Sequence, residues 1–138
     1  MVRRAKLEDA LNIFLLDTQI FDESLGPNFI NNDIRENKMA KYFVYEIGDK
    51  LIGYISAWVS DNTTILSFGV LEEYRRRGVG QMLFDALEPE IVGDLSLEVR
   101  VSNLNAIRFY EKNGLKKVAV RKDYYADHED ALLMVRSM

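Results

Sequence analysis

One stretch of the chain combines a strand, a turn of arginines and glycines, and a helix. An apolar, β-rich run ends at Val70, the turn reads Arg75-Arg76-Arg77-Gly78-Val79-Gly80, and an amphipathic segment continues to Leu87. Glycines let backbone N–H groups approach an anion closely, the start of a helix supplies positive potential, and arginines add charge-assisted hydrogen bonds. From this stretch alone, a phosphate-holding turn and a solvated basic loop are equally well supported.

The composition indicates one folded domain over residues 1–138. The chain has 138 residues, of which 48% are hydrophobic and 29% are charged, so it can form a core and is not of a disordered type. It has no cysteine and one histidine, His128. These counts exclude disulfides, thiolate ligands, a cysteine nucleophile and a multi-histidine metal site within one chain. We therefore expect no bound metal.

The charge and hydropathy of the chain indicate a soluble cytoplasmic protein. No apolar run approaches the roughly 20 residues of a membrane span, and the polar N-terminal segment is unlike a signal peptide. The net charge of −4 argues against sequence-independent nucleic-acid binding and is compatible with a basic peptide or an amine as substrate. We expect no nucleic acid and no membrane as partner.

The periodicity of apolar residues predicts the order β-α-α-β-β-β-α-β-α-β-β. Helical spacing and turn residues predict helices near residues 7–20, 27–38, 79–87 and 103–113. β-rich or alternating runs predict strands near residues 1–5, 42–47, 51–59, 63–70, 94–101, 115–121 and 131–135. In the run at 94–101 every second residue is apolar and should face the core: Leu95, Leu97, Val99 and Val101. Glu98 then lies on the polar face, where spacing alone favours a surface ion pair with Arg100.

Two motifs together resemble a known family. Arg75-x-x-Gly78-x-Gly80 after a strand, in this order of elements, resembles the acetyl-CoA-dependent N-acetyltransferases of the GNAT family. The segment from Asn103 to Leu115 is similar to the family's Asn-x-x-Ala-x-x-x-Tyr-Glu-x-x-Gly-Phe block, with Leu115 in place of the usual aromatic residue. The resemblance spans essentially the whole chain, which would then be a single GNAT domain, residues 1–138.

The resemblance implies a fold and a cofactor. The fold is α/β, with a mixed, mostly antiparallel central sheet flanked by about four helices. The cofactor is acetyl-CoA. Its pyrophosphate would be held by amides of the arginine–glycine turn, its pantetheine arm by backbone groups of Phe68, Gly69 and Val70, and its thioester carbonyl would be polarised by the Val70 amide. The implied cofactor contacts are Phe68, Gly69, Val70, Arg75, Arg76, Arg77, Gly78, Val79, Gly80, Gln81, Asn103 and Tyr110.

The resemblance also implies two catalytic residues. Glu98 resembles the general base, and because a carboxylate of ordinary pKa, about 4.3, is a weak base toward an ammonium ion, it would act through water or in an environment that favours its protonated form. Tyr110 resembles the general acid that protonates the leaving thiolate, since a phenol of pKa about 10 stays neutral at neutral pH. Structural interpretations stand beside these roles: Tyr110 could pack its helix on the sheet, and Asn103 could be a helix N-cap.

Within the family, two segments resemble the RimI branch, which acetylates the N-terminal alanine of a small-subunit ribosomal protein. They are Leu97–Asn103 and Tyr124-Tyr125 followed by Glu129-Asp130-Ala131. This resemblance implies a protein N-terminal α-amine as acceptor, direct attack in a ternary complex, and Tyr124 and Tyr125 as substrate-binding residues. The loop Phe21–Pro27, where the family shapes its acceptor pocket, has no close motif match.

Two other functions remain open from the sequence. One is a GNAT enzyme for a small amine such as a polyamine, an amino acid or an antibiotic, which would turn over without a peptide. The other is an inactive CoA-binding regulatory module, against which the presence of both Glu98 and Tyr110 argues. We expect Trp58 in the core, and His128 exposed in the polar loop Asp123–Glu129 without a catalytic role.

Overall fold

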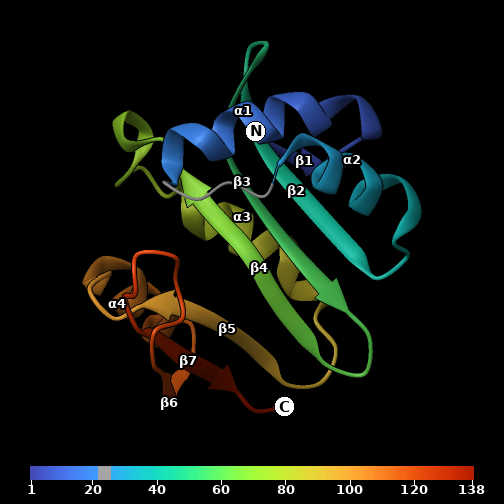
Figure 1. Ribbon diagram of the computed structural model, residues 1–138. Coiled ribbons are helices and arrows are strands. Elements are labelled where there is room, and N and C mark those ends of the chain that lie inside the picture. Colours follow the sequence, from blue (N-terminus) through green and yellow to red (C-terminus); the bar gives the residue numbers. More distant parts are fainter. Residues whose placement is uncertain (22–25) are drawn as a thin grey trace. The chain divides into compact units, whose positions relative to one another are not determined.

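The computed structural model describes residues 1–21 and 26–138 (Figure 1). Within these residues it has seven strands and four α-helices, in the predicted order. They are β1 (Val2–Arg4), α1 (Ala10–Ile20), α2 (Pro27–Glu36), β2 (Ala40–Ile47), β3 (Lys50–Val59), β4 (Thr63–Val70), α3 (Val79–Leu87), β5 (Leu95–Arg100), α4 (Leu104–Lys112), β6 (Lys116–Arg121) and β7 (Ala131–Arg136). Single 3-10 turns, at Leu7–Asp9, Glu72–Tyr74 and Glu88–Glu90, flank α1 and α3.

The strands form a mixed sheet in the order β1-β2-β3-β4-β5-β7-β6. The β1–β2, β2–β3, β5–β7 and β6–β7 pairs are antiparallel. The β4–β5 pair is parallel, with Thr63 opposite Leu95 and Thr64 opposite Ser96. A parallel pair needs a long connection, and here the chain between the two strands contains α3. The predicted α/β class with a mostly antiparallel sheet is confirmed.

The internal contacts divide the chain into two compact units. Unit 1 comprises Met1–Val59 and Ile65–Ile91, and unit 2 comprises Ser60–Thr64 and Val92–Met138. Strand β4 therefore gives its first two residues to unit 2 and the rest to unit 1.

In unit 1, helices cover both faces of the central strands. Figure 1 shows α1 and α2 in front of β2 and β3, and α3 behind them. Seven consecutive residues of β3, Leu51 to Ala57, are buried, which is the pattern expected of a strand covered on both faces. Fully buried side chains from both layers form this core: Ile13, Ile30, Ile52, Ile55, Leu83, Phe84 and Leu87.

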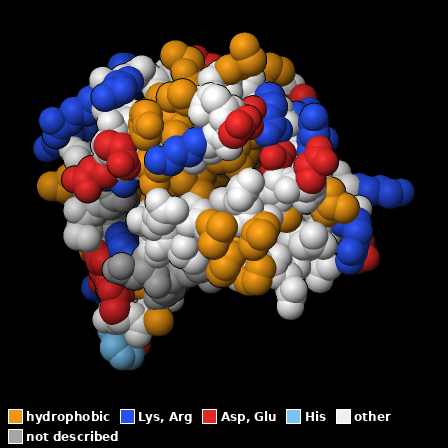
Figure 2. All heavy atoms as spheres, turned by 90° about the horizontal axis from the view of Figure 1, so that it is seen from above, with side chains coloured by type: hydrophobic (Ala, Val, Ile, Leu, Met, Phe, Trp, Pro, Cys, Tyr) orange, Lys and Arg blue, Asp and Glu red, His pale blue; other side chains and the backbone are white. Residues whose placement is uncertain are grey.

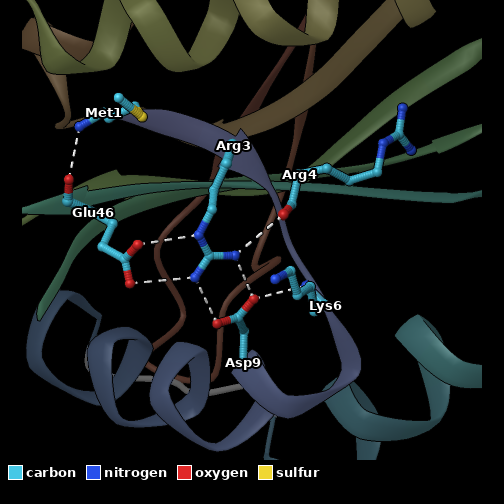
Figure 3. A network of polar contacts seen from close by, with 6 residues as sticks. All are labelled: Met1, Arg3, Arg4, Lys6, Asp9 and Glu46. Carbon is cyan, nitrogen blue, oxygen red and sulfur yellow. Dashed lines mark hydrogen bonds and ion pairs between the residues drawn. The ribbon is translucent and has the colours of Figure 1, made fainter. Parts of the chain in front are cut away.

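A charged network fixes the beginning of unit 1 (Figure 3). The guanidinium of Arg3, on β1, donates to both carboxylate oxygens of Asp9 at 2.8 and 2.9 Å, and to Glu46 on β2 at 3.2 Å. The backbone N–H of Lys6 also donates to Asp9, at 2.7 Å. The hydrogen bonds from Arg3 hold the pKa of Asp9 below its ordinary value. The network explains why an arginine occurs at position 3 in the short strand β1.

Unit 2 contains β5, β7, β6 and α4. Strand β5 alternates as predicted, with Leu95, Leu97 and Val99 buried. The prediction for Val101 is wrong: it is 38% exposed, because β5 ends at Arg100 and the chain turns toward α4. Strand β6 is an edge strand of the sheet, and all six of its residues are exposed. Its pairing with β7 shifts register between Lys117 and Ala119.

Other predictions differ from the structure in detail. Trp58 is half-buried rather than fully in the core, and its indole N–H donates to the buried Asp33 carboxylate at 3.0 Å. Helix α2 ends at Glu36, two residues before its predicted end. His128 is exposed, as expected. The predicted acceptor loop Phe21–Pro27 includes residues 22–25, which lie outside the described residues.

None of the described helices is long and apolar enough to cross a membrane. Figure 2 looks down on the molecule from the α1 side, and hydrophobic side chains show at this surface among charged ones. On α1 itself, Leu11 and Leu15 are 60% and 46% exposed.

Candidate active site

The arginine–glycine turn of unit 1 is an exposed loop whose conformation needs a glycine. Arg75, Arg76, Arg77 and Gly78 are all exposed, and α3 begins immediately afterwards at Val79. Gly78 caps that helix with φ at +80°, and Arg76 has φ at +64°, in the left-handed region that side chains disfavour. The first backbone N–H groups of a helix have no acceptor within the helix, so those of Val79 and Gly80 point toward this turn.

Gly80 is not required by the packing of the protein itself. A Cβ built on Gly80 would lie 3.5 Å from Phe68 Cζ and 4.0 Å from Val70 Cγ2, both ordinary contact distances. Its φ is not positive, so an alanine would also fit the backbone. Neither the packing nor the backbone conformation requires a glycine at position 80. A glycine there would instead let a group from outside the chain approach the backbone closely.

The structure brings the turn together with the end of β4. The Arg75 side chain folds back, and its Nε donates to the carbonyl oxygen of Val70 at 3.0 Å. Phe68 and Val70 are the neighbours of Gly80 named above. The predicted pantetheine strand Phe68–Val70 and the predicted pyrophosphate turn are thus adjacent within unit 1. Gln81, also predicted to contact the cofactor, donates its side-chain amide to Asp85 at 2.8 Å.

The end of α1 packs closely on Gly69. A Cβ at that position would lie 2.8 Å from Ile20 Cγ2 and 3.1 Å from Phe21 Cζ, so no larger residue fits without movement. A buried network below it joins the same two elements, since the Tyr54 hydroxyl bonds both Asp17 of α1 and Ser67 of β4. The helix that leads into the predicted acceptor loop is therefore fixed to the strand predicted to hold the cofactor arm.

Glu98 lies on the polar face of β5 in unit 2, with 22% of its side chain exposed. Its carboxylate accepts a hydrogen bond from Arg121 Nε at 3.1 Å. The expected surface ion pair with Arg100 is wrong, because the Arg100 guanidinium bonds Asp127 and Glu129 instead.

Tyr110 is buried, on α4 of the same unit. Burial, with a smaller contribution from Tyr125, raises the pKa of Tyr110 well above its ordinary value of 10.0. Burial likewise raises the pKa of Tyr125 to about 12, although the Arg100 cation opposes this change, and Glu98 also acts on Tyr125. Both phenols therefore keep their protons at neutral pH.

Asn103 has the structural role that the sequence offered as an alternative. It is the N-cap of α4, and its side-chain oxygen accepts a hydrogen bond from the Ala106 amide at 3.2 Å. The residue is exposed.

The predicted substrate-binding pair lies on the loop between β6 and β7. Tyr124 is 49% exposed, and its ring packs edge-on against Tyr125, with centroids 5.0 Å apart. Arg100 lies over the other ring, 4.1 Å from the Tyr125 centroid. From the sequence, Arg100 was considered only as an ion-pair partner of Glu98, although its place two residues after Glu98 on the same strand face was a usable signal for a role in the site.

Comparison with known proteins identifies the family of the chain. The model of the acetyltransferase (GNAT) family matches residues 7–115. An N-alpha-acetyltransferase of Saccharolobus solfataricus is 35% identical, over 99% of this chain and 92% of that protein. The [ribosomal protein bS18]-alanine N-acetyltransferase of Escherichia coli K12 is 30% identical, over 93% of this chain and 84% of that protein.

Comparison with solved structures shows the same fold. The crystal structure of the ribosomal-protein-S18-alanine N-acetyltransferase from Escherichia coli superposes with a TM-score of 0.89 at 24% identity, over 99% of this chain and 92% of that one. The chain therefore belongs to the GNAT family of acetyltransferases. It is an acetyl-CoA-dependent N-acetyltransferase. In residues 1–21 and 26–138 no group of three or more histidine, aspartate or glutamate side chains could hold a metal ion.

Proposed function

We propose that this enzyme transfers the acetyl group of acetyl-CoA to the N-terminal α-amine of a protein, with the N-terminal alanine of a small-subunit ribosomal protein as its principal acceptor. The observation that carries the proposal is that the sequence similarity to N-terminal acetyltransferases extends over nearly the whole chain. The N-alpha-acetyltransferase and the ribosomal-protein-alanine N-acetyltransferase match over 99% and 93% of this chain, which include the loop with Tyr124 and Tyr125. We further propose that residues 1–138 act as one catalytic domain, in the cytoplasm.

Cofactor binding is assigned to backbone groups and arginines of unit 1. The amides of Val79 and Gly80 and the positive end of α3 hold the pyrophosphate, with the exposed arginines Arg75–Arg77 around it. The backbone of Phe68–Val70 bonds the pantetheine arm, and the Val70 amide polarises the thioester carbonyl as a preorganised donor. Gln81 and Asn103 contribute further polar contacts.

Proton transfer is assigned to Glu98 and Tyr110. The acceptor amine must lose a proton, which Glu98 takes directly or through water, so that its lone pair can attack the thioester carbon. The tetrahedral adduct then collapses: its C–S bond breaks, the CoA thiolate leaves, and the second proton on the amine nitrogen passes to water or to the thiolate. Because the pKa of Tyr110 is raised well above that of a thiol, about 8.5, the phenol stabilises the departing sulfur by donating a hydrogen bond more readily than by complete proton transfer. Attack is direct, since the chain has no cysteine to carry the acetyl group.

The acceptor class is tested by measuring release of CoA thiol from acetyl-CoA. The panel contains peptides that begin with Ala, Ser, Met or Gly, alongside free polyamines and amino acids. We expect the highest kcat/KM for the alanine peptide and intersecting initial-rate patterns, as for a ternary complex. Turnover of free amines without turnover of any peptide would refute the proposal in favour of a small-amine enzyme. No turnover at all, with acetyl-CoA still bound, would indicate a binding module.

The cofactor assignment is tested by the Gly80→Ala variant. Since a Cβ at Gly80 makes only ordinary contacts within the protein, thermal stability should change little. The methyl group would lie between the helix start and the predicted pantetheine strand, next to Phe68 and Val70, so the KM for acetyl-CoA should rise by about tenfold or more. An unchanged KM would contradict this position for the cofactor.

The catalytic assignment is tested by Glu98→Gln and Tyr110→Phe. Removing a general base or acid typically lowers the rate by about a hundredfold or more, and we expect this in kcat rather than in the KM for acetyl-CoA. Arg121→Gln is the control for Glu98, because it removes the ion pair and keeps the carboxylate. If Glu98→Gln and Arg121→Gln have the same small effect, Glu98 is a surface residue and not the base.

A further inference from the structure

The two tyrosines of the β6–β7 loop are both held by one residue, Glu129. The backbone N–H groups of Tyr124 and Tyr125 each donate to the carbonyl oxygen of Glu129, at 3.2 Å. The loop is otherwise strained, with Asp123 and His128 at φ of +53° and +72°. The orientation of the tyrosine pair therefore depends on where Glu129 is held.

Glu129 is in turn fixed to the end of β5 through its side chain. One carboxylate oxygen accepts from Arg100 Nη1 at 2.9 Å, and the other accepts from the backbone N–H of Ser102 at 3.0 Å. These charge-assisted bonds hold the pKa of Glu129 below its ordinary value. The loop is thus attached to the strand that also presents Glu98.

Arg100 joins three parts of the loop at once. Its Nη1 also lies 2.9 and 3.0 Å from the two carboxylate oxygens of Asp127, and Asp127 itself accepts from the Glu129 amide at 3.1 Å. The flat guanidinium lies over the Tyr125 ring, 4.1 Å from its centroid. An arginine can bond carboxylates with its edge and stack an aromatic ring on its face at the same time, and a lysine cannot.

We propose that Arg100 is a positioning residue for the acceptor: through Glu129, Asp127 and the Tyr125 ring it holds the tyrosine pair in the orientation that contacts the N-terminal segment of the acceptor. The inference rests on the proposed function, since it takes Tyr124 and Tyr125 as acceptor contacts. A purely structural ion pair would affect stability alone. A positioning residue affects the KM for the acceptor and leaves that for acetyl-CoA unchanged.

The test compares Arg100→Met and Arg100→Lys with the matched control Arg4→Met. Arg4, in unit 1, also lies over an aromatic ring, 5.1 Å from the Phe43 centroid, and pairs with Glu90 at 3.1 Å, and no cofactor, catalytic or acceptor role is assigned to it. A displacement of about 1 Å in a substrate-positioning group can reduce the rate by about a hundredfold. Since backbone bonds of the loop remain, we expect the KM for the alanine peptide to rise about tenfold in Arg100→Met.

Four outcomes are expected together. The KM for acetyl-CoA stays within about twofold of wild type, Arg100→Lys does not restore the peptide KM although it keeps the charge, and Arg4→Met leaves both constants unchanged. The Tyr124 and Tyr125 amides report directly on the hydrogen bonds to the Glu129 carbonyl. Their hydrogen exchange becomes faster in both Arg100 variants and not in Arg4→Met.

The outcomes separate this inference from the proposed function. Unchanged amide exchange together with an unchanged peptide KM overturns the role of Arg100 and leaves the function intact. If wild-type enzyme acetylates only a free amine, the proposed function fails, and the same comparison is made with the KM of that amine. If the KM for the amine rises and amide exchange becomes faster, Arg100 is a positioning residue for that acceptor. If the KM for the amine is unchanged, the role of Arg100 is overturned.

Discussion

The buried hydroxyl of Tyr54 makes a sharp prediction about stability. Tyr54 is fully buried on β3, and its hydroxyl donates to the Asp17 carboxylate, which is 1% exposed. Because a hydroxyl has one proton, the contact of 2.6 Å to Ser67 Oγ must be a bond that the serine donates. Burial raises the pKa of Tyr54 well above its ordinary value, so the phenol remains a donor throughout the neutral range.

The magnitude for Tyr54→Phe follows from these two bonds. A hydrogen bond to a charged group contributes about 1.5–3 kcal/mol, and one between neutral groups contributes about 1 kcal/mol. The phenylalanine ring fills nearly the same volume, so no significant cavity term adds to the loss. The Asp17 carboxylate remains buried after the substitution and loses this donor. We therefore expect a loss of about 3 kcal/mol in the free energy of unfolding.

The assay is urea unfolding of wild type, Tyr54→Phe and the control Tyr74→Phe. With a slope of about 1.5 kcal/mol per molar urea, the midpoint of Tyr54→Phe should fall by about 2 M. Tyr74 contacts Lys50 and Arg77 through its ring, which phenylalanine keeps, so its midpoint should be unchanged. A loss below about 0.5 kcal/mol in Tyr54→Phe would show that the buried bond to Asp17 contributes no more than a surface contact.

Three further predictions concern other parts of unit 1. Gly69→Ala should destabilise by about 1–3 kcal/mol in thermal unfolding, because its Cβ would lie 2.8 Å from Ile20 Cγ2; unchanged stability would contradict that packing. Arg3 lowers the pKa of Asp9, so the contribution of Asp9 to stability is present above its ordinary pKa of 3.8 and is lost as the pH falls. In Asp9→Asn this loss of stability in acid should be smaller, which urea midpoints measured across acidic pH would show. Arg76→Gly should keep or slightly raise the melting temperature, because it removes a side chain from a positive φ, while raising the KM for acetyl-CoA.

The order and type of the elements were predictable from the sequence because they depend on local patterns. The alternation of β5 and the glycine at the start of α3 needed no knowledge of distant residues. The partner of Glu98 was not predictable in this way. Arg100 stands two positions away on the same face and was the natural choice, but the register of β5, β7 and β6 places Arg121 beside Glu98 instead.

The burial of the Asp33 carboxylate was also not predictable from local sequence patterns. Asp33 looks like an ordinary polar residue of α2, yet it accepts hydrogen bonds from Tyr42, Trp58 and Asn37, which surround it on β2, β3 and the end of the helix. Its burial follows from donors supplied by strands that come later in the chain.

The exposed strand β6 has a consequence for handling the protein at high concentration. Val118 and Val120 are 55% and 51% exposed on a terminal strand, which is the kind of edge onto which another copy can add a strand. Lys116 and Lys117 place positive charges there, and the irregular register beside Lys117 bends the edge. Crystal engineering that replaces these lysines with small or apolar residues would remove the barrier to edge-to-edge association, so the other exposed lysines are the safer positions to change.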